Sequence, residues 1–169
     1  MPASLRRNLA EAQPYQRFLY AVAAVFAASA VLHAVAFVAD DRPWAGRGSW
    51  RQPLAFSVAF VLVLPSLAWA MNFVATRRRL GWAVSATMGV AALATVLLIA
   101  VQTWRGHPAF FPEDRAVDQS LWTGIQIGVG FIVAAIVVQA VWVVALVAAS
   151  QSIRWGPFEP ASCSYSPVW

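Results

Sequence analysis

Four long apolar stretches alternate with short polar ones along the chain. They cover residues 18–38, 54–75, 80–104 and 121–149, and none of them contains Asp, Glu, Lys or Arg. A helix needs about 20 apolar residues to cross a bilayer core, and a lone segment in lipid satisfies its backbone by becoming helical. The pattern predicts an all-α protein, an integral membrane four-helix bundle. We assign residues 17–150 to it, between an N-terminal segment (1–16) and a disordered tail (151–169).

Composition excludes a soluble domain. Of the 169 residues, 60% are hydrophobic and 11% are charged, whereas soluble proteins carry about 25% charged residues. The net charge of +5 does not indicate nucleic-acid binding, because the Arg residues stand at the ends of apolar stretches. The single cysteine, Cys163, excludes an internal disulfide and a multi-cysteine metal site.

Charge asymmetry predicts the orientation in the membrane. Seven Arg and two acidic residues lie on the side that holds both termini, whereas five Arg and five acidic residues lie on the other. Cytoplasmic loops carry the excess of Arg and Lys. We therefore expect a multi-pass protein of a bacterial inner (cytoplasmic) membrane with both termini cytoplasmic. The alternative, a signal peptide cleaved near residues 34–36, requires an apolar run shorter than the observed one.

Two polar loops, residues 40–53 and 105–120, fall on the outer side. Both mix Arg, Asp, Gly, Pro and Trp, so we expect them to meet as an outer polar cap. One interpretation is a lid of Arg–carboxylate pairs that only satisfy each other. The other is a site for an anionic or aromatic ligand, or for a partner, with Arg51 and Arg105 as candidates, since each adjoins a helix end.

His33 is the only His, Asp, Glu, Lys or Arg inside the four stretches. It lies roughly 7 Å below the outer end of its helix, at 1.5 Å per residue, at the depth expected for Gln102 and Gln126. Such a residue is a functional candidate: a proton carrier, a haem or metal ligand, or a quinone partner. The alternative is a structural hydrogen bond to Gln102 or Gln126. Haem with two axial histidines requires His107, which is placed in a loop, and no zinc-ligand spacing occurs.

The last apolar stretch contains a GxxxG pattern, Gly124 to Gly128. This pattern permits close approach of another helix, either within the bundle or in a second copy. Short helices enclose little volume, so we expect a homo-oligomer or a larger membrane complex as well as contact with the lipid bilayer. No stretch carries a mid-membrane acid or base, a phosphate loop or a protease motif, so a non-enzymatic role is favoured.

Two motifs resemble those of a family of small bacterial membrane proteins. "WRQPLAF" (50–56) matches Trp-basic-x-Pro-Leu-x-Phe, and "QTWRG" (102–106) matches Gln-x-x-Arg-Gly. In the loop that follows, the family reads Ser-His-Phe-Asn where this chain has "GHPAFF" (106–111). The resemblance implies four membrane helices and no particular activity. The matching positions are Trp50, Arg51, Pro53, Leu54, Phe56, Gln102, Arg105, Gly106, His107, Phe110 and Asp118.

From these patterns we expect a non-enzymatic membrane subunit, or a module that senses a ligand or partner through the outer cap. The alternative is a small redox or transport protein that binds a quinone, haem or small anion near His33. The first of these functions, a membrane subunit or sensing module, requires no cofactor and no metal. The candidate binding residues are His33, Trp50, Arg51, Gln102, Arg105, His107, Asp118 and Gln126.

Overall fold

The computed structural model describes residues 12–40, 48–73, 78–107 and 115–154. These ranges contain four long helices and no strand: α2 (Pro14–Ala39), α3 (Arg51–Ala70), α4 (Arg78–Trp104) and α5 (Ala116–Arg154). A short 3₁₀ turn, η1 (Met71–Phe73), follows α3. All four helices are long and apolar enough to cross a membrane, which confirms the predicted fold class.

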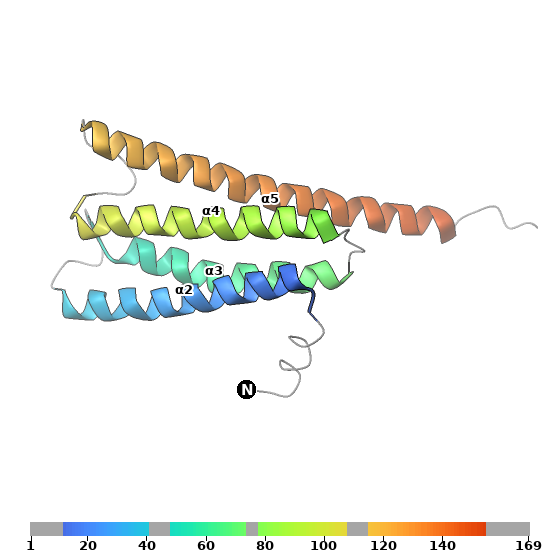
Figure 1. Ribbon diagram of the computed structural model, residues 1–169, viewed down its shortest axis with the longest axis horizontal. Helices are drawn as coiled ribbons and strands as arrows, with labels where there is room; N and C mark the ends of the chain where they lie inside the picture. The colour runs from blue at the N-terminus through green and yellow to red at the C-terminus, as the bar shows by residue number, and fades with distance from the viewer. Residues whose placement is uncertain (1–11, 41–47, 74–77, 108–114, 155–169) are drawn as a thin grey trace, which may run out of the picture.

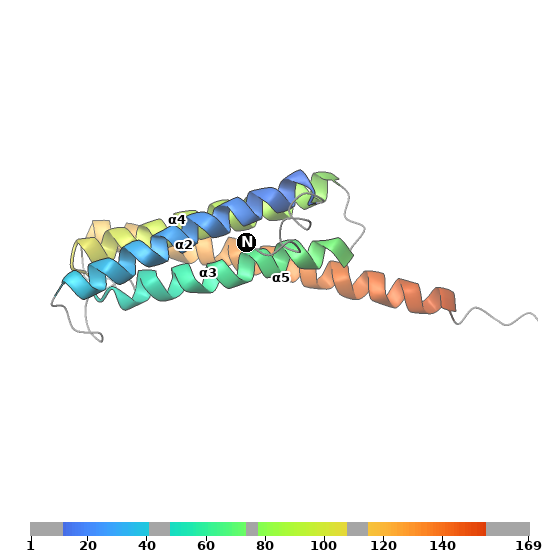
Figure 2. The ribbon, with the colours of Figure 1, turned by 90° about the horizontal axis from the view of Figure 1, so that it is seen from below.

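The helices run side by side along one common direction (Figures 1 and 2). Helix α2 packs most extensively on α3, and α4 on α5, while α4 also contacts both α2 and α3. The molecule is thus two helical pairs joined through α4. The ends at Ala39, Arg51, Trp104 and Ala116 lie together, and we call this the cap end. Helix α5 extends beyond the other three at the opposite end (Figure 1).

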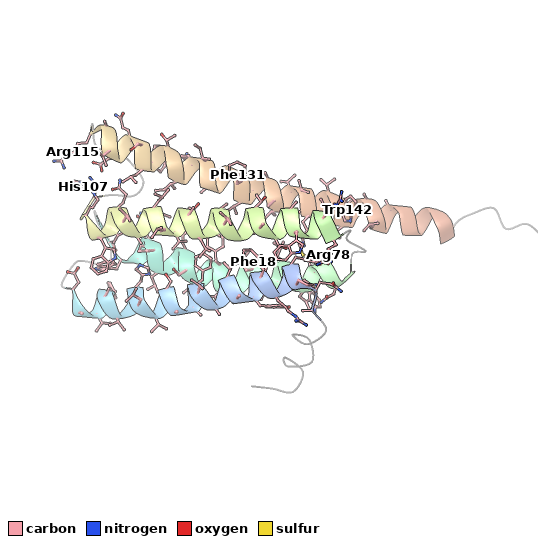
Figure 3. The ribbon with its side chains drawn as sticks, in the orientation of Figure 1. Phe18, Arg78, His107, Arg115, Phe131 and Trp142 are labelled. Carbon is pink, nitrogen blue, oxygen red and sulfur yellow. The ribbon has the colours of Figure 1, made fainter. Side chains whose placement is uncertain are left out.

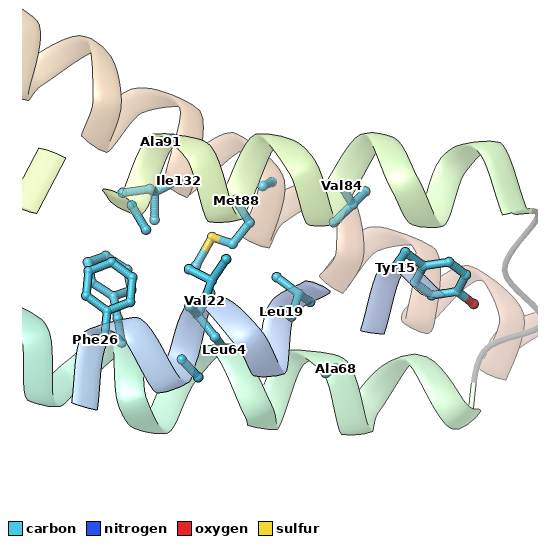
Figure 4. Close-up of a cluster of buried hydrophobic side chains, with 14 of the residues drawn as sticks. Tyr15, Leu19, Val22, Phe26, Leu64, Ala68, Val84, Met88, Ala91 and Ile132 are labelled. Atoms are coloured by element: carbon cyan, nitrogen blue, oxygen red, sulfur yellow. The ribbon is translucent and has the colours of Figure 1, made fainter. Parts of the chain in front are cut away.

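The core is a column of apolar side chains between α2, α3 and α4 (Figure 4). Leu19, Leu64 and Met88 are fully buried, and the rings of Phe26 and Phe60 stack with centroids 5.0 Å apart. Helix α5 adds few residues to this core, so most of its surface faces outward. In a membrane that surface meets lipid or another protein.

Glycines on α4 and α5 permit the closest helix contacts. A Cβ at Gly81 would touch Tyr15 of α2, and one at Gly128 would overlap the Thr95 hydroxyl of α4. A Cβ at Gly124 would lie 3.0 Å from Leu98, also on α4. The GxxxG face of α5 therefore packs against α4 within the chain.

The helix bounds differ from the apolar stretches in informative ways. Helix α2 begins at Pro14, where the missing proline N–H is tolerated, and the Gln13 backbone N–H donates to Gln16 Oε1 at 2.7 Å. Helix α3 ends at residue 70 rather than 75. Helix α5 continues to Arg154, four residues into the segment assigned to the tail; residues 155–169 lie outside the described ranges.

Candidate functional site

The C-terminal end of α4 explains the spacing in "QTWRG". The Gly106 N–H donates to the Thr103 carbonyl (2.9 Å) and the His107 N–H to the Gln102 carbonyl (3.0 Å). Together with the positive φ of Gly106, 75°, these two bonds form a Schellman motif. The motif stops the helix at Trp104 and leaves Arg105 one turn beyond Gln102, on the same side of the helix.

Arg105, Gln102 and Asp118 form one polar cluster at the cap end. Arg105 Nη1 donates to Asp118 Oδ1 and to Gln102 Oε1, each at 2.8 Å, and Gln102 Nε2 lies 3.4 Å from Asp118 Oδ1. The Asp118 side chain is 1% exposed and that of Arg105 is 33% exposed. The cluster ties the end of α4 to the first turn of α5, where a carboxylate is also favoured by the helix dipole.

The hydrogen-bonding groups of this cluster are only partly paired within the described residues. Asp118 Oδ2 is buried without a hydrogen-bond partner in the part of the chain that the structure describes. Arg105 uses Nη1 alone, and its Nε and Nη2 make no hydrogen bond to any described residue. A guanidinium can present two parallel donors to a carboxylate or phosphate. The side of Arg105 that faces away from Asp118 therefore suits an anionic group.

Trp50 connects the remaining elements of the cap end. Its indole N–H donates to Asp40 Oδ2 at 2.8 Å. Its ring lies 6.0 Å from that of His33 and meets that of Trp104 edge to face at 4.9 Å. Trp50 is 3% exposed, so this one side chain joins α2, α3 and α4. Offset and edge-to-face ring pairs of this kind stabilise beyond the area that they bury.

The two loops at the cap end approach each other closely beside Trp50. A Cβ on Gly48 would lie 2.9 Å from the Gly106 backbone, and Gly48 has a φ of 67°. Both features require glycine. The structure thus supports the expectation that these two loops meet. The described part of the contact lies at these glycines, since residues 41–47 and 108–114 fall outside the described ranges.

His33 is held by α2 and α3, not by the glutamines named from the sequence. Its Nδ1 lies 2.7 Å from the Ser29 carbonyl, and Ser29 Oγ lies 3.1 Å from Ser57 Oγ. Ser57 Oγ donates to the Pro53 carbonyl at 2.7 Å. The predicted bond from His33 to Gln102 or Gln126 was wrong, because Gln102 turns to Arg105 and Gln126 faces outward.

A groove of about 320 Å³ runs between α2 and α4 at the depth of His33. His33 and Ser29 are its polar residues, while its rim consists of exposed apolar side chains such as Leu32 and Leu97. This volume lies within the range of small-molecule sites, roughly 300–1,000 Å³. The remaining lining residues are Val25, Phe26, Leu93, Val96, Ala100, Val101 and Trp104.

The other candidates lie apart from this cluster or at its edge. Arg51 is exposed in the first turn of α3. His107 Nε2 lies 3.4 Å from Arg115 Nη1 at the cap end (Figure 3). Gln126 is exposed on the side of α5 opposite Gly124 and Gly128. The structure therefore brings together Gln102, Arg105 and Asp118, and separately His33 and Trp50.

Two residues of the site were not singled out from the sequence. Ser57 is fully buried and completes the chain of bonds that begins at His33. The sequence feature that could have indicated Ser57 is a single hydroxyl residue within an apolar stretch, four residues after Pro53. Asp40 was counted only as a loop charge, although it accepts the bond from Trp50. No spacing rule links a carboxylate to a tryptophan ten residues later.

No group of three or more His, Cys, Asp or Glu side chains suited to a metal ion occurs among the described residues. Comparisons with family models, with curated proteins and with solved structures found no match. The function is therefore argued from the geometry of the two sites.

Proposed function

We propose that this protein is a non-enzymatic sensing module of the membrane, which binds an anionic ligand, or an acidic segment of a partner, through Arg105 at the outer cap. The observation that carries this proposal is the half-used guanidinium of Arg105. Its inner side is held by Asp118 and Gln102, and its other donors are unpaired within the described chain. The buried carboxylate orients the guanidinium before a ligand arrives, which lowers the entropic cost of binding.

The position of this cluster gives ligand binding a structural consequence. Arg105 belongs to the end of α4 and Asp118 to the start of α5. An anion that competes with Asp118 for Arg105 weakens the tie between these helices. Because Asp118 Oδ2 has no hydrogen-bond partner among the described residues, few described contacts hold the carboxylate once Arg105 turns away. Sensing then consists of a change in how α5 packs at the cap end.

The cap is tested by titrating the purified protein in phosphatidylcholine nanodiscs with inorganic phosphate and then acetate, at constant ionic strength set with chloride. Trp50 and Trp104 lie in the cap, so tryptophan emission reports the binding. We expect a saturable change that Arg105→Gln abolishes. Arg115→Gln is the matched control, because Arg115 is exposed and does not bond Asp118. A response that is unchanged in Arg105→Gln would refute the proposal.

The protein is further proposed to form a homo-oligomer through the outward face of α5. Gln119, Thr123, Gln126 and Gly130 recur at spacings of four and three residues and are all exposed. This repeat is the seam of a helix pair. Gln126 is polar and lies in an apolar span, where it gains from a hydrogen bond to the same residue of a second copy. Crosslinking of Gln126→Cys, compared with Ile127→Cys on a neighbouring face, tests the seam.

The membrane is proposed to be a bacterial inner membrane, with the cap end outside and both termini in the cytoplasm. The excess of Arg on the terminal side supports this orientation. The first turn of α2 and the last of α5 lie at the same end of the molecule (Figure 1). A reporter fused after Trp169 should be active only in the cytoplasm, and periplasmic activity would contradict the orientation.

A second candidate function, redox or transport activity near His33, is favoured by one observation. The groove between α2 and α4 places Ser29 and His33 beside exposed apolar side chains such as Leu32 and Leu97, which suit contact with lipid. A quinone fits this setting better than haem, since His33 is the only histidine that lines the groove. Substitution of His33 by Ala should abolish such an activity and leave the anion response of the cap intact.

A further inference from the structure

We propose that the groove between α2 and α4 binds a lipid-soluble hydroquinone, and that it selects the reduced, hydroxyl-bearing form over the quinone. This inference rests on the second candidate function and identifies its ligand. It uses neither Arg105 nor Asp118, so it is independent of the anion site.

The direction of the hydrogen bonds around His33 determines what the ligand must offer. The Ser29 carbonyl can only accept, so His33 Nδ1, 2.7 Å away, carries the proton. Ser57 donates to the Pro53 carbonyl, and its oxygen is therefore the acceptor for the Ser29 hydroxyl. The donor groups of His33, Ser29 and Ser57 in this series of hydrogen bonds are thus all engaged. The neutral ring is left with Nε2 as an acceptor, and His33 makes no other hydrogen bond among the described residues.

A ligand that completes this site must donate a hydrogen bond and carry no charge. A hydroquinone hydroxyl can donate to Nε2. The corresponding quinone has only carbonyl oxygens, which would face a lone pair. No charged side chain lines the groove, so a phosphate or ammonium head would be buried without a counter-charge, which is costly. A phospholipid head is excluded for the same reason.

The shape and surface of the groove suit one substituted ring. Its volume of about 320 Å³ is at the lower end of small-molecule sites. Phe26 and Trp104 offer aromatic surface, and Trp50 lies directly behind His33. The exposed rim residues Leu32 and Leu97 belong to the lipid-facing surface of α2 and α4. An apolar tail can therefore remain in the bilayer while the ring enters sideways.

Three probes of the same skeleton test the selection: 2-decyl-1,4-hydroquinone, its oxidised benzoquinone and its 1,4-dimethyl ether. Binding to the full chain in nanodiscs is measured anaerobically as a concentration-dependent rise in melting temperature. We expect the hydroquinone to bind about tenfold more tightly than the dimethyl ether, the factor that one net hydrogen bond supplies. The quinone should bind no better than the ether.

A direct readout comes from the imidazole nitrogens. The chain has two histidines, so the ¹⁵N signals of His33 are assigned by comparison with His33→Gln. The hydroquinone should shift the signal of unprotonated Nε2, whereas the ether should not. His33→Phe should bind all three probes equally. Leu97→Trp, which fills the rim, should abolish binding, while Val90→Trp, equally exposed on α4 but outside the groove, should not.

The outcomes separate this inference from the function on which it rests. If the benzoquinone binds more tightly than the hydroquinone, a redox or transport role survives and the selection proposed here is wrong. If all three probes bind equally well to the wild-type protein, the groove is only an apolar surface and the inference is overturned. If none binds, or Leu97→Trp changes nothing, both the inference and the second candidate function fail.

Discussion

The hydroxyl of Thr95 on α4 occupies the space that a side chain at Gly128 on α5 would fill. Thr95 is fully buried, and its Oγ1 has no hydrogen-bond partner within the described residues. This contact is the closest approach of the two helices at the described glycines. It shows that a glycine of the GxxxG pattern serves the packing of α5 against α4.

Gly128→Ala should destabilise the protein, because the new methyl group collides with the Thr95 hydroxyl. Overpacking of this kind costs about 1–3 kcal/mol of unfolding free energy. Gly130→Ala is the control, since no atom lies within 4 Å of a Cβ there, and it should be neutral or slightly stabilising. Thr95→Ala removes an unpaired hydroxyl and should restore most of the stability of Gly128→Ala. Denaturant unfolding in micelles measures all four variants, and additive effects would contradict the proposed clash.

In a double-mutant cycle on Arg105 and Asp118, we expect removal of one partner to cost more stability than removal of both. Asp118→Leu leaves Arg105 without its carboxylate and should cost about 2 kcal/mol of unfolding free energy, less than a fully buried pair because Arg105 is 33% exposed. Arg105→Met/Asp118→Leu leaves no unpaired charge and should cost less than Asp118→Leu alone. A double variant that is less stable than either single variant would show that the pair itself is strongly stabilising.

The two positive-φ glycines of the cap should differ in their tolerance of alanine. Gly106→Ala meets no neighbour within 4 Å, so only the left-handed backbone opposes it, at about 1–2 kcal/mol. Gly48→Ala adds a collision with the Gly106 backbone at 2.9 Å and should lose more stability. The melting temperatures of the two variants show which one is less stable. Equal losses of stability would mean that the two loops separate at little cost in free energy.

Trp50→Phe removes the indole N–H and leaves Asp40 Oδ2 without that donor. Loss of one such bond, together with a smaller ring against Trp104, should lower the unfolding free energy by about 1–2 kcal/mol. Trp69→Phe, at an exposed position near the end of α3, the helix that Trp50 precedes, provides the matched control. Stability that falls equally in both variants would contradict the linking role of Trp50.

Much of the fold could be predicted from the sequence because the distribution of apolar and charged residues largely decides it. The absence of charge over four stretches of about 20 residues or more forces helices in a bilayer, whatever their neighbours are. The apolar stretch that ends at residue 104 likewise matches the end of α4 at Trp104, beyond which Gly106 adopts a φ of 75° that glycine readily accepts. Asp118 was a named candidate, although its partners were not known.

The pairings that make the sites could not be read in this way. His33 was matched with Gln102 and Gln126 on depth alone, yet depth does not specify the rotation of each helix. The rotation of α4 is determined by its close contacts with α2 and α5, at Gly81 of α4 and at Gly128 of α5. It turns Gln102 towards Asp118 and leaves Ser57 of α3 to bond Ser29 beside His33.

The sequence by itself determined that the chain holds four helices long and apolar enough to cross a membrane, with polar segments between them, since hydropathy and charge act locally and need no partner. Only the tertiary structure decided which polar groups have no hydrogen-bond partner within the described ranges. Asp118 Oδ2, the outer donors of Arg105 and the acceptor of His33 are identified by the bonds that their neighbours already make. Such bonds depend on the packing of helices far apart in the chain.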